Sequence, residues 1–241
     1  MSRDGSRSEM ARRWFLARIG VGAGAVGAGI VGAGAVGTEM IGSSAEAQAA
    51  ADSAWRPARH TQDDWYDKIP GVHRYVIDSA SAEGFGWAVW FAGNYYTANE
   101  DAYGLKDSDL AVIIVARHKS TSFGYNDAIW AKWGKQLSEQ AEFVDPKTKE
   151  PPKVNYYAGP GDGSQLSGKM DGVIKRGVQF AVCSMSTRGI ATRIAKASGL
   201  EVDAVVKEIT ANLVPNARMV PAGVVAVNRA QERGYSFVFA I

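Results

Sequence analysis

The segment LAVIIVA, residues 110–116, contains no polar side chain and is rich in β-branched residues. A strand in a sheet with one solvated face alternates apolar and polar residues, whereas a strand covered on both faces reads as an unbroken apolar run. A second run of this kind, VQFAVC, occupies residues 178–183. Two such runs predict a parallel sheet that carries helices on both of its faces.

Strand and helix patterns alternate along residues 72–241. Further strand patterns occur at 73–81, 217–223 and 235–241, and segments with helical spacing lie between them. This alternation predicts an α/β fold, a flavodoxin-like three-layer sandwich with a mostly parallel five-stranded sheet. In such sheets binding sites form beyond the carboxyl ends of the strands. We therefore expect residues 79–83, 117–122 and 183–188 to meet at one edge.

The N-terminal part resembles an export signal. Arg12 and Arg13 are adjacent and precede the residues Trp-Phe-Leu, which is typical of a twin-arginine signal. The uncharged stretch 19–38 has the length of a membrane span, but eight of its twenty residues are glycine, which disfavours a stable helix. Small-x-small cleavage sites follow at 45–47 and 47–49. We expect residues 1–49 to be removed after export by the twin-arginine translocase to the periplasm; the alternative is a retained membrane anchor.

The remaining chain is expected to form one domain. Residues 50–71 are polar with scattered aromatics and predict a linker or an arm, while 72–241 predict the α/β domain. Proline, glycine and charged residues dominate 145–168, which predicts a long surface loop. Long structureless loops within a domain are often functional lids or family-specific insertions.

Composition excludes several classes of function. The chain has 27 basic and 25 acidic residues without a basic tract, so we expect no nucleic-acid partner. With one cysteine and three dispersed histidines, a zinc-type cluster is not expected. The stretch GPGDGSQLSG lacks the Lys-Ser/Thr ending of a phosphate-binding loop. We therefore expect neither a metal nor a cofactor.

Cys183 is the only cysteine and ends the second apolar run. It has no partner in its own chain for a disulfide. The helix pattern that follows is expected to begin near Ser186 or Thr187, and a helix N-terminus favours a thiolate over a thiol. The supporting residues expected around the sulfur are Arg117, His118, Ser184, Ser186, Thr187 and Arg188. The alternative is that Cys183 is core packing, since unpaired cysteine is among the most buried residue types.

Several stretches together resemble the DsrE/DsrF-like family, and most of all its exported branch with twin-arginine signals. They are GVQFAVCSMSTRGIA at 177–191 and LVPNARMVPAGVVAVNRAQERGYSFVFA at 213–240, with HRYVIDSAS and VIIVARH…YNDAIWAKW before them. The resemblance implies a DsrE-like α/β fold, a homo-oligomer that is a trimer or hexamer, and sulfur carried as a persulfide on Cys183. It also implies a thiol-bearing partner protein that receives the sulfur.

Three hypotheses on function follow. The first is a periplasmic sulfur carrier or relay protein with Cys183 as its catalytic residue. The second is a non-catalytic, oligomeric binding module for a small ligand or a protein, with a structural cysteine. The third is a cysteine-dependent hydrolase with His118 as its base, which requires the two side chains to be close together.

Overall fold

The sheet consists of five parallel strands in the order β4-β3-β2-β1-β5. The computed structural model describes residues 56–241, so the expected signal peptide with Arg12 and Arg13 lies outside the described residues. The strands are β1 (His73–Ser79), β2 (Leu110–Ala116), β3 (Gln179–Cys183), β4 (Ala217–Val220) and β5 (Ser236–Ala240). All seven residues of β2, which lies in the middle of the sheet, are buried, as its unbroken apolar run predicts.

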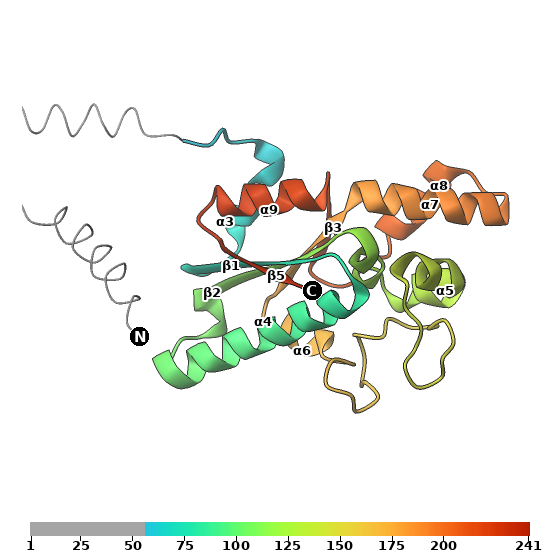
Figure 1. Ribbon diagram of the computed structural model, residues 1–241. Coiled ribbons are helices and arrows are strands. Elements are labelled where there is room, and N and C mark those ends of the chain that lie inside the picture. The colour runs from blue at the N-terminus through green and yellow to red at the C-terminus, as the bar shows by residue number, and fades with distance from the viewer. Residues whose placement is uncertain (1–55) are drawn as a thin grey trace, which may run out of the picture. The chain divides into compact units, whose positions relative to one another are not determined.

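Helices cover both faces of the sheet, which confirms the predicted three-layer α/β fold (Figure 1). One face carries the long helix α4 (Ala82–Tyr103) and the short helix α6 (Met170–Lys175). The other face carries α9 (Gly223–Gln231) and α3 (Trp65–Lys68). Strands β1 to β4 lie side by side in the order of the chain, and α9 then connects β4 to β5, which pairs with the other edge of β1. Because crossovers between parallel strands are right-handed, this reversal puts α9 on the face opposite α4.

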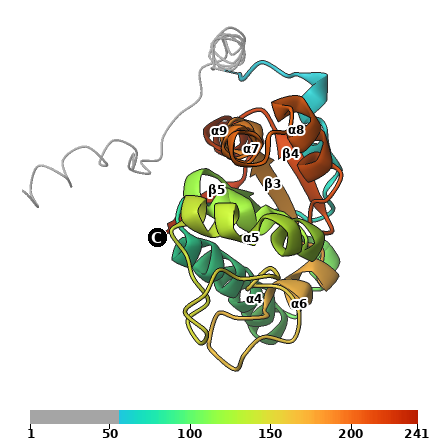
Figure 2. The same cartoon turned by 90° about the vertical axis from the view of Figure 1, so that its right-hand side faces the viewer.

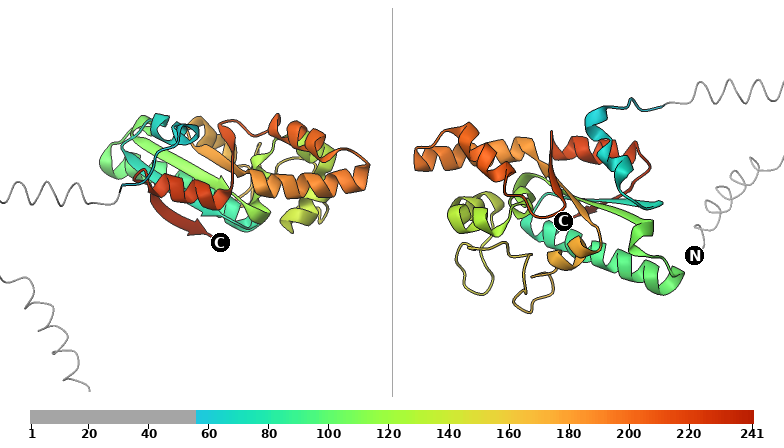
Figure 3. Two further views of the ribbon diagram at one scale, coloured as in Figure 1. Left: turned by 90° about the horizontal axis from the view of Figure 1, so that it is seen from above. Right: turned by 180° about the vertical axis from the view of Figure 1, so that it is seen from behind.

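Helices α5 (Asp127–Ala141), α7 (Ser184–Ser198) and α8 (Val202–Thr210) extend past the carboxyl ends of the strands (Figures 1 and 3). Helix α7 begins at Ser184, two or three residues before the expected start, because Cys183 itself caps it. The 3-10 helices are η1 (Thr61–Asp63), η2 (Asp107–Asp109) and η3 (His118–Gly124). Within residues 56–241, no helix combines the length and the apolar character needed to cross a bilayer.

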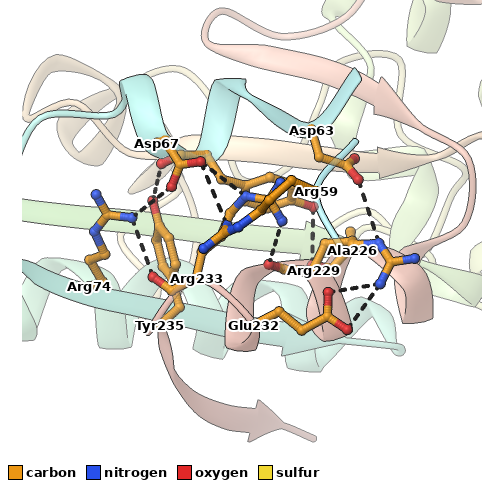
Figure 4. Close-up of polar contacts among 10 residues, drawn as sticks. Arg59, Asp63, Asp67, Arg74, Ala226, Arg229, Glu232, Arg233 and Tyr235 are labelled. Atoms are coloured by element: carbon orange, nitrogen blue, oxygen red, sulfur yellow. Dashed lines mark hydrogen bonds and ion pairs between the residues drawn. The ribbon is translucent and has the colours of Figure 1, made fainter. Parts of the chain in front are cut away.

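Residues 57–69, in the segment expected to be a linker or an arm, pack against α9. Trp65, Tyr66 and Ile69 are buried in an apolar cluster with α9 and the strands. The Tyr66 hydroxyl donates to the Ala226 carbonyl at 3.1 Å, and the Arg233 guanidinium contacts the Asp67 carboxylate at 3.2 Å. Figure 4 shows the ion pair of Asp67 with Arg233 and a neighbouring one between Asp63 and Arg229. These pairs link the segment to α9 and to the turn that follows it. Residues 57–241 accordingly form one compact unit.

The chain between α5 and α6 contains no helix or strand, and it lies beside α4 and α5 (yellow in Figures 2 and 3). Two helical glycines allow this close approach. A Cβ atom added at Gly86 of α4 would lie 2.6 Å from the Tyr157 ring, and one at Gly134 of α5 would lie 2.2 Å from the Pro152 carbonyl oxygen. Asn155 donates to the carbonyl oxygens of Phe123 and Tyr125 at 2.8 and 2.9 Å. The predicted loop is therefore packed closely against the domain.

Candidate functional site

Cys183 ends β3 and is the N-cap residue of α7, so its side chain lies where two elements meet at the carboxyl edge of the sheet. Its sulfur accepts hydrogen bonds from the Ser186 backbone N–H at 3.4 Å and from the Ser186 hydroxyl at 3.3 Å. Two hydrogen-bond donors and the positive end of the helix therefore lie at the sulfur. Only 5% of Cys183 is exposed, so the thiol is recessed below the surface.

Ser186 connects the sulfur to the segment that follows β2. Its hydroxyl oxygen accepts a hydrogen bond from the His118 backbone N–H at 3.1 Å. The ring of His118 is exposed, and its Nδ1 lies 3.4 Å from the Ala80 carbonyl oxygen. The imidazole therefore contacts the backbone after β1, and both hydrogen-bond donors to the sulfur come from Ser186. The Cys–His hydrogen bond on which a hydrolase would depend is not formed in the described part of the chain.

Arg117, the residue after β2, forms an ion pair with Asp78 of β1. Its guanidinium makes hydrogen bonds of 2.8 to 3.1 Å to both carboxylate oxygens of Asp78, which is 4% exposed. The hydrogen bonds to Asp78 raise the pKa of Arg117, and the charges of Asp78 and Cys183 add to that effect, against an opposing effect of burial. A Cβ atom added at Gly223 would lie 2.5 Å from the Arg117 Cβ atom, so α9 begins directly against this arginine.

Of the remaining predicted residues, Thr187 contacts the backbone of Cys183, Ser184 lines a cavity, and Arg188 lies on the surface. The Thr187 hydroxyl donates to the Cys183 carbonyl at 2.9 Å and lies 2.8 Å from the Tyr125 hydroxyl, which is buried and whose pKa burial raises. Ser184 lines a cavity of about 320 Å³ together with Val220, the residue that pairs with Cys183 across β3 and β4. Arg188, in contrast, pairs with Asp203 of α8 at 3.0 Å on the exposed surface.

A larger cavity, of about 720 Å³, lies at the same edge of the sheet but does not include Cys183 among its lining residues. The start of α4, the segment after β2, the end of α5 and the long loop all contribute to its walls. Aromatic rings from three of these segments line it: Trp87, Phe143, Tyr156 and Tyr157. The sequence predicted the loop itself, but nothing in the order of residues indicated which helices it would contact.

Two residues that contact predicted site residues, Asp78 with Arg117 and Tyr125 with Thr187, were not found from the sequence. Asp78 lies inside β1, where a single carboxylate in a strand has no recognisable motif, and Tyr125 follows η3. Among residues 56–241, no group of three or more histidine, cysteine, aspartate and glutamate side chains is placed to hold a metal ion. The fold and the site thus define a three-layer α/β protein with a recessed, hydrogen-bonded thiol and a separate aromatic cavity at the carboxyl edge of its sheet.

Comparisons with known proteins assign this chain to no family. No family model matches the chain, and no curated protein matches it. Among solved structures, a protein of unknown function, MTH1491 from Methanobacterium thermoautotrophicum, is similar with 14% sequence identity and a TM-score of 0.36, over 69% of this chain and 98% of its own. The resemblance to DsrE/DsrF-like proteins stays a prediction from the sequence.

Proposed function

We propose that the protein carries sulfur as a persulfide on Cys183. The observation that supports this most is the placement of the sulfur as the N-cap of α7, where it accepts two hydrogen bonds from Ser186. A buried cysteine that serves only as packing needs no such donors, whereas a persulfide carrier needs an anionic sulfur at the start and at the end of each transfer. Arg117 follows β2, the strand next to β3, but its pair with both carboxylate oxygens of Asp78 offsets much of its positive charge.

The proposed transfer involves two displacements without net oxidation. The Cys183 thiolate attacks the outer sulfur of a donor persulfide, forms a new S–S bond, and releases the donor as a thiolate. An acceptor thiolate then attacks the outer sulfur on Cys183, which regains its own thiolate. These steps follow the chemistry of thiol–disulfide exchange, whose rate depends on the fraction of thiolate and on access.

Access to the sulfur is restricted, which limits the donors that fit. The 320 Å³ cavity lined by Ser184 and Val220 adjoins Cys183, because Ser184 follows it in the chain and Val220 pairs with it in the sheet. Cys183 itself does not line this cavity, so a donor persulfide held there would reach the sulfur only after the edge of the sheet opens.

The test is the intact mass of the protein before and after treatment with a small persulfide donor. We expect a gain of one sulfur atom that a reductant removes, and no gain in the Cys183→Ser variant. A matched control is Ser198→Ala, at the far end of the same helix, which should load like the wild type. Loading that persists in Cys183→Ser, or that is absent from the wild type, would contradict the proposal.

We also propose that the protein is exported by the twin-arginine pathway and acts as a homo-oligomer in the periplasm. The support is the Arg12–Arg13 pair and the resemblance described above. Replacing both arginines with lysine should leave the protein in the cytoplasmic fraction, while a wild-type-like distribution of that variant would contradict the export proposal. Sedimentation of the purified protein would reveal its oligomeric state.

A second candidate function is a binding module in which Cys183 is structural. The 720 Å³ cavity favours it, because that volume lies within the range of ordinary small-molecule sites and four aromatic residues line it. The two candidates differ in the reactivity of the thiol. Alkylation of the folded protein at a rate close to that of a free thiol favours sulfur carriage, and resistance to alkylation until unfolding favours the binding module.

A further inference from the structure

The 720 Å³ cavity has walls that come from separate parts of the chain and are held in place firmly. Trp87 lies on α4, Phe143 follows α5, and Tyr156 and Tyr157 come from the long loop. The Tyr157 hydroxyl donates to the Ala82 carbonyl at 2.7 Å, which attaches the loop to the first turn of α4. A cavity with such fixed walls is formed before any ligand arrives, which lowers the entropic cost of binding.

The aromatic rings of the cavity are in part accessible. Trp87, Phe143 and Tyr156 are each half-buried, so part of each ring remains free to contact a ligand. Phe143 and Tyr156 pack together with centroids 5.1 Å apart, and the Tyr156 hydroxyl is fixed by Ser164 at 3.0 Å. Rings of this kind offer flat apolar surfaces with electron-rich faces.

The charges of the cavity are not balanced. Lys119 forms an ion pair with Glu142, so these two side chains largely cancel each other. Glu83 is exposed, and within the described residues its one hydrogen bond comes from the Trp87 indole N–H at 3.2 Å. It lies in the first turn of α4, where it offsets the partial positive charge of the helix end. An indole that donates to a carboxylate also has a more electron-rich ring, which strengthens its attraction for a cation.

We propose that this cavity binds an organic cation that carries an aromatic ring, with the positive charge placed between Glu83 and the face of Trp87. The apolar part of the ligand then lies against Phe143 and Tyr156. The proposal rests on the second candidate function, the binding module, and gives its ligand class. It does not depend on the chemistry of Cys183, whose side chain does not line the cavity.

The test compares two probes of nearly equal shape, N-methylquinolinium and quinoline, by titration calorimetry at neutral pH, where only the first is charged. We expect the cation to bind about tenfold more tightly than the neutral molecule, which corresponds to the size of a cation–π contact joined to one nearby carboxylate. Glu83→Gln should reduce this difference, because the cation then keeps only its contact with the Trp87 ring, and Trp87→Leu should weaken the binding of both probes. The Cys183→Ser variant should bind like the wild type.

Matched controls separate the site from general effects on the helices. Trp90→Leu changes a partly buried tryptophan on the same helix outside this cavity, and Glu139→Gln removes an exposed charge from α5. Both should bind N-methylquinolinium as the wild type does. Because Glu83 is exposed, its variant tests the charge even if Trp87→Leu folds poorly.

The possible failures have different meanings. Equal affinity for the two probes would overturn the preference for a cation and leave the binding module in place. Absence of binding by either probe, or full binding by a folded Trp87→Leu variant, would overturn the cavity as the site.

Discussion

Replacing Gly86 with alanine tests whether the long loop is as closely packed as the structure indicates. The added Cβ atom would lie 2.6 Å from Tyr157 Cε1 and 3.1 Å from Leu166 Cδ1. Tyr157 has little room to move, because it is 2% exposed and its hydroxyl is bonded to Ala82. Overpacking costs about 1–3 kcal/mol and loss of the hydrogen bond about 1 kcal/mol, against a gain in helix propensity of about 1 kcal/mol. The net loss in free energy of unfolding is about 1–3 kcal/mol.

Gly93 provides the matched control, because it lies in the same helix and its added Cβ atom would meet only Val173 at 3.8 Å, an ordinary contact. Gly93→Ala should therefore stabilise the protein by up to about 1 kcal/mol. Urea denaturation of the two variants and the wild type measures both changes, and thermal unfolding should shift by about 2–4 °C for each kcal/mol. If Gly86→Ala is as stable as Gly93→Ala, the loop does not pack on α4 in the way described.

Three further predictions concern the thiol and the buried polar groups. Ser186→Ala should slow alkylation of Cys183 about tenfold, since it removes a hydrogen bond to the thiolate that contributes about 1.5 kcal/mol, and an unchanged rate would show that the hydroxyl does not act on the sulfur. Asp78→Asn should lower the free energy of unfolding by about 2–3 kcal/mol, because it leaves a partly buried arginine without its countercharge. Asp203→Asn, in an exposed pair, should change the free energy of unfolding by less than about 0.5 kcal/mol. Similar losses for the two variants in denaturation experiments would contradict this contrast. Burial raises the pKa of Tyr235 to about 12, so on raising the pH the unfolded chain releases this proton before the folded protein does. The stability due to the neutral phenol is therefore present below pH about 10 and lost as the pH rises to about 12. Urea denaturation at a series of alkaline pH values should show that decline, and constant stability over this range would refute it.

The sequence predicted the elements of the fold better than their arrangement. The run at 110–116 identified a strand buried on both faces because burial on both sides leaves a local signature in the residues themselves. The strand order depends on which face each crossover takes, and the sequence carries no comparable local signal for that choice. The return of β5 to the side of β1 therefore became visible only in the structure.

The candidate site shows the same division between local and long-range information. The position of Cys183 at a strand end, with Ser186 close by, follows from a few neighbouring residues. Arg188 was expected near the sulfur, but its side chain reaches Asp203 on the next helix, a choice set by how α7 and α8 pack. The aromatic cavity depends on contacts between residues more than sixty positions apart, such as Tyr157 with Ala82, which single-sequence patterns do not reveal.

The place of β5 beside β1 has a consequence for the order of events during synthesis. Tyr75 of β1 pairs with Ser236, and the Tyr235 hydroxyl donates to the Tyr66 carbonyl at 2.8 Å. The sheet and its apolar cluster are therefore formed jointly by segments from opposite ends of the domain. Contacts over such sequence separations form slowly and only after both partners have left the ribosome. A nascent chain that ends before residue 223 would expose the open edge of β1 and the apolar side chains of Trp65, Tyr66 and Ile69. Proteases and chaperones would thus be able to distinguish a truncated chain from a complete one by these exposed segments alone.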